Sequence, residues 1–309
     1  MCSTGQRHTA TDLIPLLTTT RAHSALSCVG RWCWLLISCI VATAAAGSIA
    51  EISTDGLPRE ARVPGGVVLI AVGNADAPKP MVTRDGANVW TVKRGPSWIA
   101  VLGLPLATAP GEYSINVTNA GVTQALPFTV LNKRYPVQHV TLKDNAMVEP
   151  PIEVIARLEF ESAHLETVRS NWREDTNTNA SFILPANGRL SGRFGGSRVL
   201  NGKPRAPHAG LDVAIGTGTP VLAPGDGVVL DTGNYYFCGN ALFVDHGNGL
   251  ISLFCHLSGY VAKVGDSVRQ GQVVAHSGAT GRASGPHLHW SVYLNGVSVE
   301  PELFVTIKK

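Results

Sequence analysis

Short apolar runs separated by turn-forming residues are the feature that most limits the fold of this chain. The sequence of 309 residues contains 33 glycines and 19 prolines, and few stretches in it show apolar residues at helical spacing. Glycine and proline favour turns, and short β-rich runs between them are typical of strands. We therefore predict a mainly β protein with many tight turns, long enough for two ordinary domains.

The runs upstream of residue 131 predict a small β-sandwich. Clear examples are residues 67–72, 98–102 and 113–117, which are separated by Gly, Pro, Asp and Asn turns. Residues 109–113, followed by an alternating strand, are typical of the hairpins that close immunoglobulin-like modules. No catalytic grouping of side chains occurs in this part of the chain, so residues 51–131 are expected to form a β-sandwich-like domain.

Residues 132–180 have a different character. Charged residues become more frequent, two consecutive prolines occur at 150 and 151, and apolar residues recur at near-helical spacing over residues 152–173. This pattern predicts a linker with one helix. Short strands and turns return from residue 181, where a turn at Asp226-Gly227 and a hairpin between segments 264–268 and 270–274 are expected. Residues 181–309 are therefore predicted to form an antiparallel, highly turned β-sheet domain.

The N-terminal region is predicted to direct export. Residues 32–46 are apolar, too short to span a bilayer comfortably, preceded by Arg21 and Arg31, and followed by small residues that suit a signal peptidase. Residues 1–50 are interpreted as an export signal or, if uncleaved, as an anchor that associates with the membrane. Residues 36–39 also loosely fit a lipoprotein cleavage box. We expect the protein to lie in the periplasm or elsewhere in the cell envelope.

The cysteines divide into two groups. Four of the six lie in or before the export segment, whereas Cys238 and Cys255 lie well after it. These two flank a predicted hairpin whose turn is residues 246–249, and an oxidising compartment permits a disulfide between them. Two buried free thiols are an equal alternative, because spacing alone does not establish disulfide geometry.

The charge of the chain bears on its partners. The formal net charge of +3 is mild, and no basic run is dense enough to indicate nucleic-acid binding. We expect no nucleic-acid partner, and no more than a weak attraction to an anionic surface or polymer.

Two histidine motifs carry the predicted chemistry. They are His208-Ala-Gly-Leu-Asp212 and His287-Leu-His289. Side chains alternate between the two faces of a strand, so His287 and His289 share one face while Leu288 points into the core. Catalytic zinc takes three imidazole or carboxylate ligands and leaves a fourth position for water. The two motifs supply three such ligands and a spare histidine, which indicates a metal-dependent hydrolase.

Together with their neighbours, these motifs closely resemble the lysostaphin-like (LytM-type) peptidoglycan metalloendopeptidases over roughly residues 184–304. The other motifs are Ser191-Gly-Arg-Phe-Gly195, Ala223-Pro-Gly-Asp-Gly-Val228, Asp245-His-Gly-Asn-Gly249, Cys255-His256-Leu257 and Thr280-Gly281. The resemblance implies that His208, Asp212 and His289 bind one Zn²⁺ ion. It also implies that His256 and His287 serve the reaction without binding the metal. Histidine titrates near physiological pH, so these two are expected to exchange protons and to stabilise the oxyanion.

Other residues near the motifs are not expected to take part in the reaction. His246 and His276 are read as structural histidines, and Asp245 as a residue that either stabilises a turn or orients a neighbouring group. Some family members place a tyrosine shortly before the first ligand, but residues 198–207 contain none. We do not transfer that role to Tyr235 or Tyr236.

The resemblance implies an exported zinc endopeptidase that hydrolyses amide bonds in the peptide cross-links of peptidoglycan. A D,D-endopeptidase acting on links between D-alanine and diaminopimelate is preferred to an enzyme acting on glycine bridges, since the chain lacks a recognisable wall-anchoring repeat. The alternative is a non-catalytic regulator that activates other cell-wall hydrolases. Retention of all three implied ligands and of both helper histidines argues against that alternative.

Overall fold

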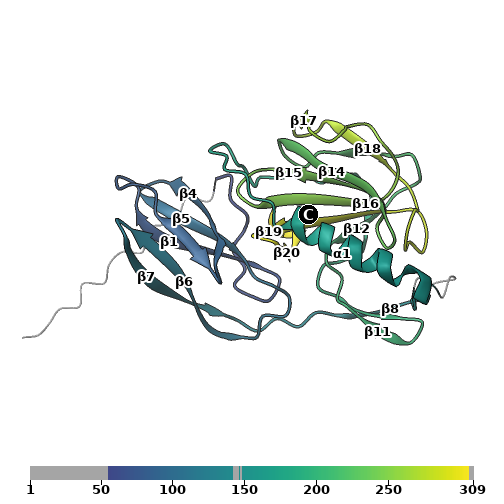
Figure 1. The fold of residues 1–309 in the computed structure, drawn as a ribbon, viewed down its shortest axis with the longest axis horizontal. Helices are drawn as coiled ribbons and strands as arrows, with labels where there is room; N and C mark the ends of the chain where they lie inside the picture. Colours follow the sequence, from purple (N-terminus) through teal and green to yellow (C-terminus); the bar gives the residue numbers. More distant parts are fainter. Residues whose placement is uncertain (1–54, 142–145, 147, 306–309) are drawn as a thin grey trace, which may run out of the picture. The chain divides into compact units, whose positions relative to one another are not determined.

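The computed structural model describes residues 55–305 except for residues 142–145 and 147. These described residues belong to one compact unit, and the predicted export segment lies outside them. The described part is mainly β with antiparallel sheets, which confirms the predicted fold class (Figure 1). Within these residues, no helix combines the length and the apolar character needed to cross a bilayer.

Two small antiparallel sheets form the first part of this unit. Their orders are β1-β5-β4 and β3-β2-β6-β7. The strands are β1 (Val67–Asn74), β2 (Met81–Arg84), β3 (Ala87–Asn88), β4 (Trp90–Arg94), β5 (Ser97–Gly103), β6 (Gly111–Asn119) and β7 (Val122–Val130). Buried side chains from both sheets, such as Leu102, Ile115 and Phe128, meet in one cluster. Short apolar runs separated by turn residues therefore form the predicted sandwich.

The predicted helix follows, and its first turn is a 3-10 helix. Residues Ile152–Val154 form this turn, and α1 continues over Ile155–Arg169. Pro151 precedes the turn, where its missing N–H is not needed. Glu161 on the helix accepts a hydrogen bond of 2.8 Å from the backbone N–H of Tyr236, and buried Val168 packs with side chains of the large sheet. The helix is thus fixed against that sheet.

The large sheet has ten strands among the described residues, with the main order β17-β14-β15-β16-β19-β12-β9. The strands are β9 (Arg189–Gly192), β12 (Leu211–Ala214), β13 (Pro220–Leu222), β14 (Gly227–Tyr235), β15 (Gly239–Asp245), β16 (Leu250–Tyr260), β17 (Ser267–Val268), β18 (Val273–Ser277), β19 (Leu288–Leu294) and β20 (Val297–Val299). A separate small sheet contains β8 (Val137–Val140), β10 (Ser197–Leu200) and β11 (Lys203–Arg205), with β8 parallel to β10. The segment before the helix is therefore part of a sheet.

The main core is a buried cluster that includes side chains of both the large sheet and the sandwich. It joins Phe254 and Trp290 of the large sheet to Trp90, Ile99 and Val101 of the sandwich, all of them fully buried. Complete burial of a large apolar side chain contributes roughly 1.5–3 kcal/mol. This shared core packs the large sheet, which carries the histidine motifs, against the sandwich.

One predicted hairpin is present and another is wrong. β15 and β16 pair across the turn at residues 246–249, as expected. Segments 264–268 and 270–274 do not pair with each other, because β17 pairs with β14 while β18 pairs with β13 and β16. Val274 and Ala275 are buried in the main core, and this burial fixes the partners of β18.

His246 and Asp245 stabilise the β15–β16 turn. The His246 Nδ1–H donates to the carbonyl of Asp226 at 2.7 Å, and its Nε2 accepts from the Ser252 hydroxyl at 2.9 Å. Asp245 accepts a hydrogen bond of 2.7 Å from the N–H of Gly247 and pairs with Arg173. Both side chains are committed to structural contacts, in agreement with the structural interpretation of His246.

His246 predicts a pH dependence of stability. Burial lowers its pKa to about 4. An unfolded histidine has a pKa of about 6.5, so the unfolded state takes up the proton first as the pH falls. The free energy of unfolding is therefore expected to drop by about 3 kcal/mol from this residue between pH 6.5 and pH 4, at about 1.4 kcal/mol per unit. Urea unfolding of wild type and His246→Asn across this range measures the difference. Equal pH slopes for the two proteins would contradict the assignment.

Candidate metal centre

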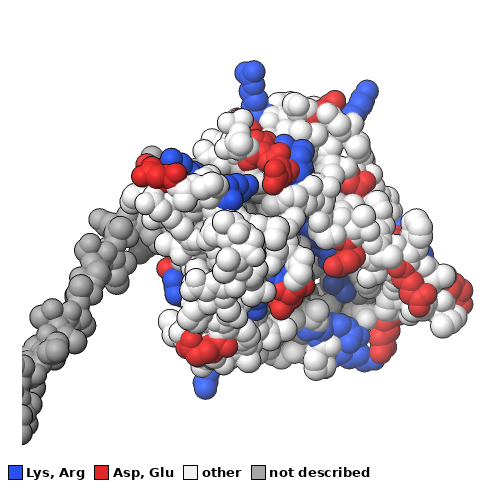
Figure 2. Space-filling view, turned by 60° about the vertical axis from the view of Figure 1, so that its left-hand side comes forward, with Lys and Arg blue, Asp and Glu red and all other residues white. Residues whose placement is uncertain are grey.

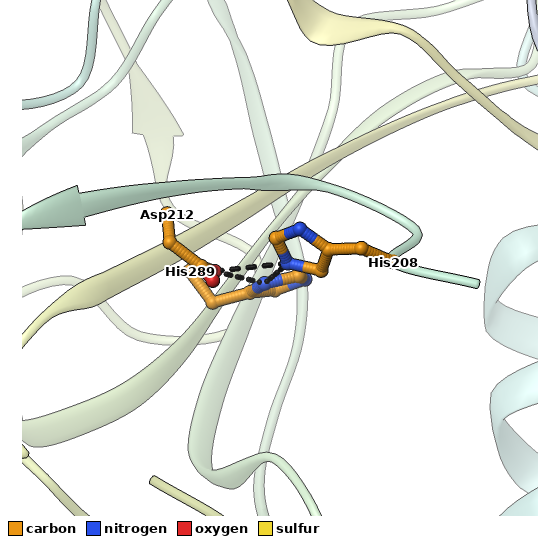
Figure 3. A group of neighbouring side chains, drawn as sticks. All are labelled: His208, Asp212 and His289. Atoms are coloured by element: carbon orange, nitrogen blue, oxygen red, sulfur yellow. Dashed lines mark hydrogen bonds and ion pairs between the residues drawn. The ribbon is translucent and has the colours of Figure 1, made fainter. Parts of the chain in front are cut away.

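His208, Asp212 and His289 meet at one point of the large sheet. β12 pairs antiparallel with β19 in the register that sets Asp212 opposite His289, and His208 lies shortly before β12. The His208 Nε2 and the His289 Nδ1 lie 3.0 and 2.8 Å from the same carboxylate oxygen, Asp212 Oδ1. The two ring nitrogens are 3.0 Å apart, so three donor atoms form a small triangle (Figure 3).

The donor set fits a zinc ion. The His208 Nδ1 lies 3.0 Å from the carbonyl oxygen of Arg193, which only accepts, so Nδ1 carries the proton and Nε2 presents a lone pair. The other ring nitrogen of His289, Nε2, lies 2.8 Å from the Ser291 hydroxyl oxygen, which can accept a hydrogen bond from it. Zinc with ligands of this kind at 2.0–2.2 Å in tetrahedral geometry separates them by about 3.3 Å, close to the observed triangle. Hydrogen bonds at the ring nitrogen that does not bind the metal fix the orientation of metal-binding histidines.

The electrostatics of Asp212 agree with a ligand role. Burial alone raises the pKa of its carboxyl, but the contacts with His208 and His289 outweigh burial and hold the pKa well below its usual range. The side chain is therefore a carboxylate at physiological pH, which is the form that binds metal.

The glycine in the first motif is required by close packing. A Cβ atom at Gly210 would lie 2.6 Å from His289 Cε1 and 2.6 Å from the backbone oxygen of Trp290. Any side chain there would displace the His289 ring. The spacing His-x-Gly-x-Asp therefore leaves room for the second motif to approach the first.

His256 and His287 lie beside the triangle. Their ring centroids are 4.6 Å apart, and the His287 Nε2 is 3.9 Å from Asp212 Oδ1. The Nδ1–H of His256 donates to the carbonyl of Thr280, and that of His287 donates to the carbonyl of Gly285, both at 2.8 Å. Each ring therefore keeps Nε2 available as an acceptor. Leu288 between the two motif histidines is fully buried, as the alternation predicted.

His256 is held in an unusual backbone conformation. Its φ of 62° lies in the left-handed region, which costs a residue with a side chain roughly 1–3 kcal/mol. A hydrogen bond of 2.8 Å from its N–H to the carbonyl of Cys238 helps to hold it there. Burial, together with the nearby His289 and His287, lowers the pKa of His256 to about 3, so its ring is neutral at physiological pH.

A cleft of about 480 Å³ opens onto these residues. Its lining includes Asp212, His256, His287 and His289, whereas His208 is only 1% exposed and holds the triangle from behind. Further lining residues are His139, Ser191, Gly192, Leu200, Ala214, Arg282, Ser284, Gly285 and Pro286. The arrangement combines a candidate metal centre with two further imidazoles in a space large enough for a peptide segment.

The tyrosines do not reach this cleft. The hydroxyl of Tyr235 donates to Asp231, and that of Tyr236 donates to the carbonyl of Ala146 at 3.1 Å. The described lining of the cleft contains no tyrosine. Ser291 was not predicted from the sequence, although the two-residue strand period from His289 indicates it.

Cys238 and Cys255 form a disulfide with Cα atoms 4.9 Å apart. This settles the choice between a disulfide and free thiols. The disulfide joins Cys255, the residue before His256, to Cys238, whose carbonyl accepts the hydrogen bond from the His256 N–H. It therefore lies directly behind one of the two imidazoles of the cleft.

Removal of this disulfide is expected to lower both stability and activity. The bridge spans 17 residues, and closing a loop of this length contributes about 3 kcal/mol in the chain-entropy model. We expect Cys238→Ala/Cys255→Ala to lose this amount in urea unfolding and to lose activity through a misplaced His256, with the metal content unchanged. Wild-type activity in a destabilised double variant would show that the bridge does not position His256.

Comparisons with known proteins give consistent matches. Residues 206–301 match the model of Peptidase family M23, and residues 60–133 match that of the Peptidase family M23 N-terminal domain. A crystal structure of a Pseudomonas aeruginosa protein assigned to peptidase M23 is 36% identical, covers 79% of this chain and 95% of that chain, and superposes with a TM-score of 0.67.

Two curated relatives match part of the chain. Peptidoglycan DD-endopeptidase ShyA of Vibrio cholerae is 37% identical over 129 residues, 42% of this chain and 26% of that protein. DD-carboxypeptidase/endopeptidase Mpg of Neisseria meningitidis is 44% identical over 94 residues, 30% of this chain and 22% of that protein. The matched region thus spans about a quarter of the length of these relatives.

Proposed function

Because the chain belongs to peptidase family M23, we propose that it is a zinc endopeptidase that hydrolyses amide bonds in the peptide cross-links of peptidoglycan. The observation that carries the proposal is the convergence of two imidazoles and one carboxylate beside two further imidazoles in one cleft. We assign His208, Asp212 and His289 to one Zn²⁺ ion, and His256 and His287 to the reaction.

The chemistry follows from what each group can do. A bound zinc ion would acidify a water molecule and polarise the carbonyl of the scissile amide. His256 and His287 each use Nδ1–H to bind a backbone carbonyl, which leaves Nε2 to accept a proton and return it. The separation of 4.6 Å between their rings allows both to contact one reacting amide. These two residues would thus handle the proton transfers that amide hydrolysis requires.

The substrate and the location are part of the same proposal. The relatives named as DD-endopeptidases support a D,D-specific cut, of the kind that opens links between D-alanine and diaminopimelate. The Cys238–Cys255 disulfide supports an oxidising compartment, and with it export to the periplasm or cell envelope. An export signal or membrane anchor at residues 1–50, and domain limits at residues 131 and 180, stay predictions.

Charge on the surface agrees with a substrate other than nucleic acid. Figure 2 shows Lys and Arg side chains interspersed with Asp and Glu side chains on the face in view, without an extensive patch of one sign. The absence of a nucleic-acid partner stays a prediction.

The test is digestion of purified cell-wall sacculi by the purified protein. We expect cross-linked peptide dimers to be converted to monomers, with the activity removed by a chelator and restored by zinc. Intact dimers in the presence of zinc would contradict the proposal. Stimulation of an added wall amidase under those conditions would instead support the regulator alternative.

A further inference from the structure

Arg282 lies between the cleft and a second depression in the surface. This depression, which we call the side hollow, has a volume of about 490 Å³ and is lined by Val148, Glu149, Pro150, Arg205, Ala206, Phe237 and Arg282. Most of these side chains are apolar. Arg282 is the residue that the described linings of the cleft and the side hollow share.

The Arg282 side chain is held in place. Its guanidinium carbon lies 4.2 Å from the centre of the Phe237 ring, and its backbone N–H donates to the Phe237 carbonyl at 2.8 Å. The preceding Gly281, at φ 69°, lies so close to Gly239 that a Cβ atom would be 2.2 Å from the Gly239 nitrogen. Stacking on an aromatic ring and a fixed loop reduce the entropy that the long side chain loses when it binds a ligand.

The same loop orients His256. The carbonyl of Thr280 accepts the His256 Nδ1–H, and the Thr280 hydroxyl accepts a hydrogen bond of 3.0 Å from the N–H of Asn240. Arg282 follows Thr280 by two residues. The loop therefore fixes the position of Arg282 relative to the His256 ring. A residue that selects substrates by the position of one charged group needs such a fixed place.

Arg282 supplies a positive charge at this side of the cleft. Among the described lining residues, Asp212 is the one acidic side chain and Arg282 the one lysine or arginine. Asp212 belongs to the candidate metal centre. Guanidinium is always charged, and its planar fork matches a carboxylate with two parallel hydrogen bonds.

We propose that Arg282 is a specificity-determining residue that binds a free carboxylate of the peptide substrate, at the side of the cleft that leads into the side hollow. The ligand class is a peptide that carries a free carboxylate close to the scissile amide, with a neighbouring aliphatic segment against the apolar side chains of the side hollow. This inference rests on the proposed function and adds the group by which the substrate is recognised.

Two synthetic cross-linked peptides that differ only at this group provide the test. One carries the free carboxylate and the other its primary amide, and both kcat/KM and equilibrium binding are measured with the zinc-loaded protein. We expect wild type to prefer the carboxylate by roughly 10–100-fold, the range of a charge-assisted hydrogen bond, mainly through KM. Arg282→Gln is expected to bind and cleave the two peptides equally well, with unchanged zinc content. Arg282→Lys should keep part of the preference.

Arg205→Gln is the matched control, because Arg205 lines the side hollow but not the cleft. It should keep the wild-type ratio. Equal binding of the two peptides by wild type, or an equal loss for both peptides in Arg282→Gln, would overturn the assignment. Wild type could also bind the carboxylate peptide more tightly but cleave neither peptide. If Arg282→Gln then abolished the binding preference, the assignment of Arg282 would stand and the proposed peptidase activity would be refuted.

Discussion

Substitution of His208 by alanine is expected to abolish stoichiometric zinc binding and to lower the cleavage of cross-linked peptides by about 10³-fold or more. His208 is 1% exposed and supplies one corner of the donor triangle. Its removal leaves two donors at a site where catalytic zinc requires three protein ligands. A loss of about 4 kcal/mol of transition-state stabilisation corresponds to a 10³-fold effect. Metal analysis of the purified variant and digestion of sacculi measure the two quantities.

His276→Ala is the control for this experiment. His276 lies in β18 and is not among the described residues that line the cleft. This variant is expected to keep both zinc and activity. Retention of one equivalent of zinc by His208→Ala would show that the triangle is not the metal centre.

Substitution of His287 by alanine is expected to have a large effect of a different kind. The variant should keep one zinc ion and lose about 10²–10⁴-fold in kcat, the usual contribution of a general acid or base. The reason is its position, because the His287 Nε2 lies 3.9 Å from Asp212 Oδ1, whereas the three donor atoms lie within 3.0 Å of one another. Zinc analysis and steady-state kinetics on a defined cross-linked peptide measure both properties.

His256→Ala is likewise expected to keep one zinc ion and to lose kcat. The centroid of the His256 ring is 6.1 Å from that of His289. If either variant lost zinc in proportion to its activity, that histidine would be a ligand, and its assignment to proton transfer would be wrong.

The parts of the fold that depend on local sequence were predictable. The sandwich strands and the β15–β16 hairpin follow from short apolar runs with turn residues at their ends. The partners of β17 and β18 were not predictable from turns, because they depend on which apolar side chains become buried together. The same is true of the parallel pairing of β8 with β10, which joins segments about 60 residues apart in the sequence.

The candidate site, too, was predictable from local sequence only in part. The shared face of His287 and His289 follows from the strand period, and the structure places both residues at the cleft. The proximity of Asp212 to His289 depends on a register between strands 77 residues apart, which only the resemblance to a family implied. The carbonyls of Arg193 and Thr280, which orient His208 and His256, have no signature in the sequence because every residue carries such a group.

Anomalous diffraction at the zinc absorption edge, from crystals of the zinc-loaded protein, tests the proposed metal centre most directly. We expect one peak at about 2.0–2.2 Å from His208 Nε2, Asp212 Oδ1 and His289 Nδ1, with His256 and His287 near it but not bonded to it. A peak bonded to other side chains, or no peak at these three atoms, would contradict the assignment of the ligands and with it the proposed mechanism.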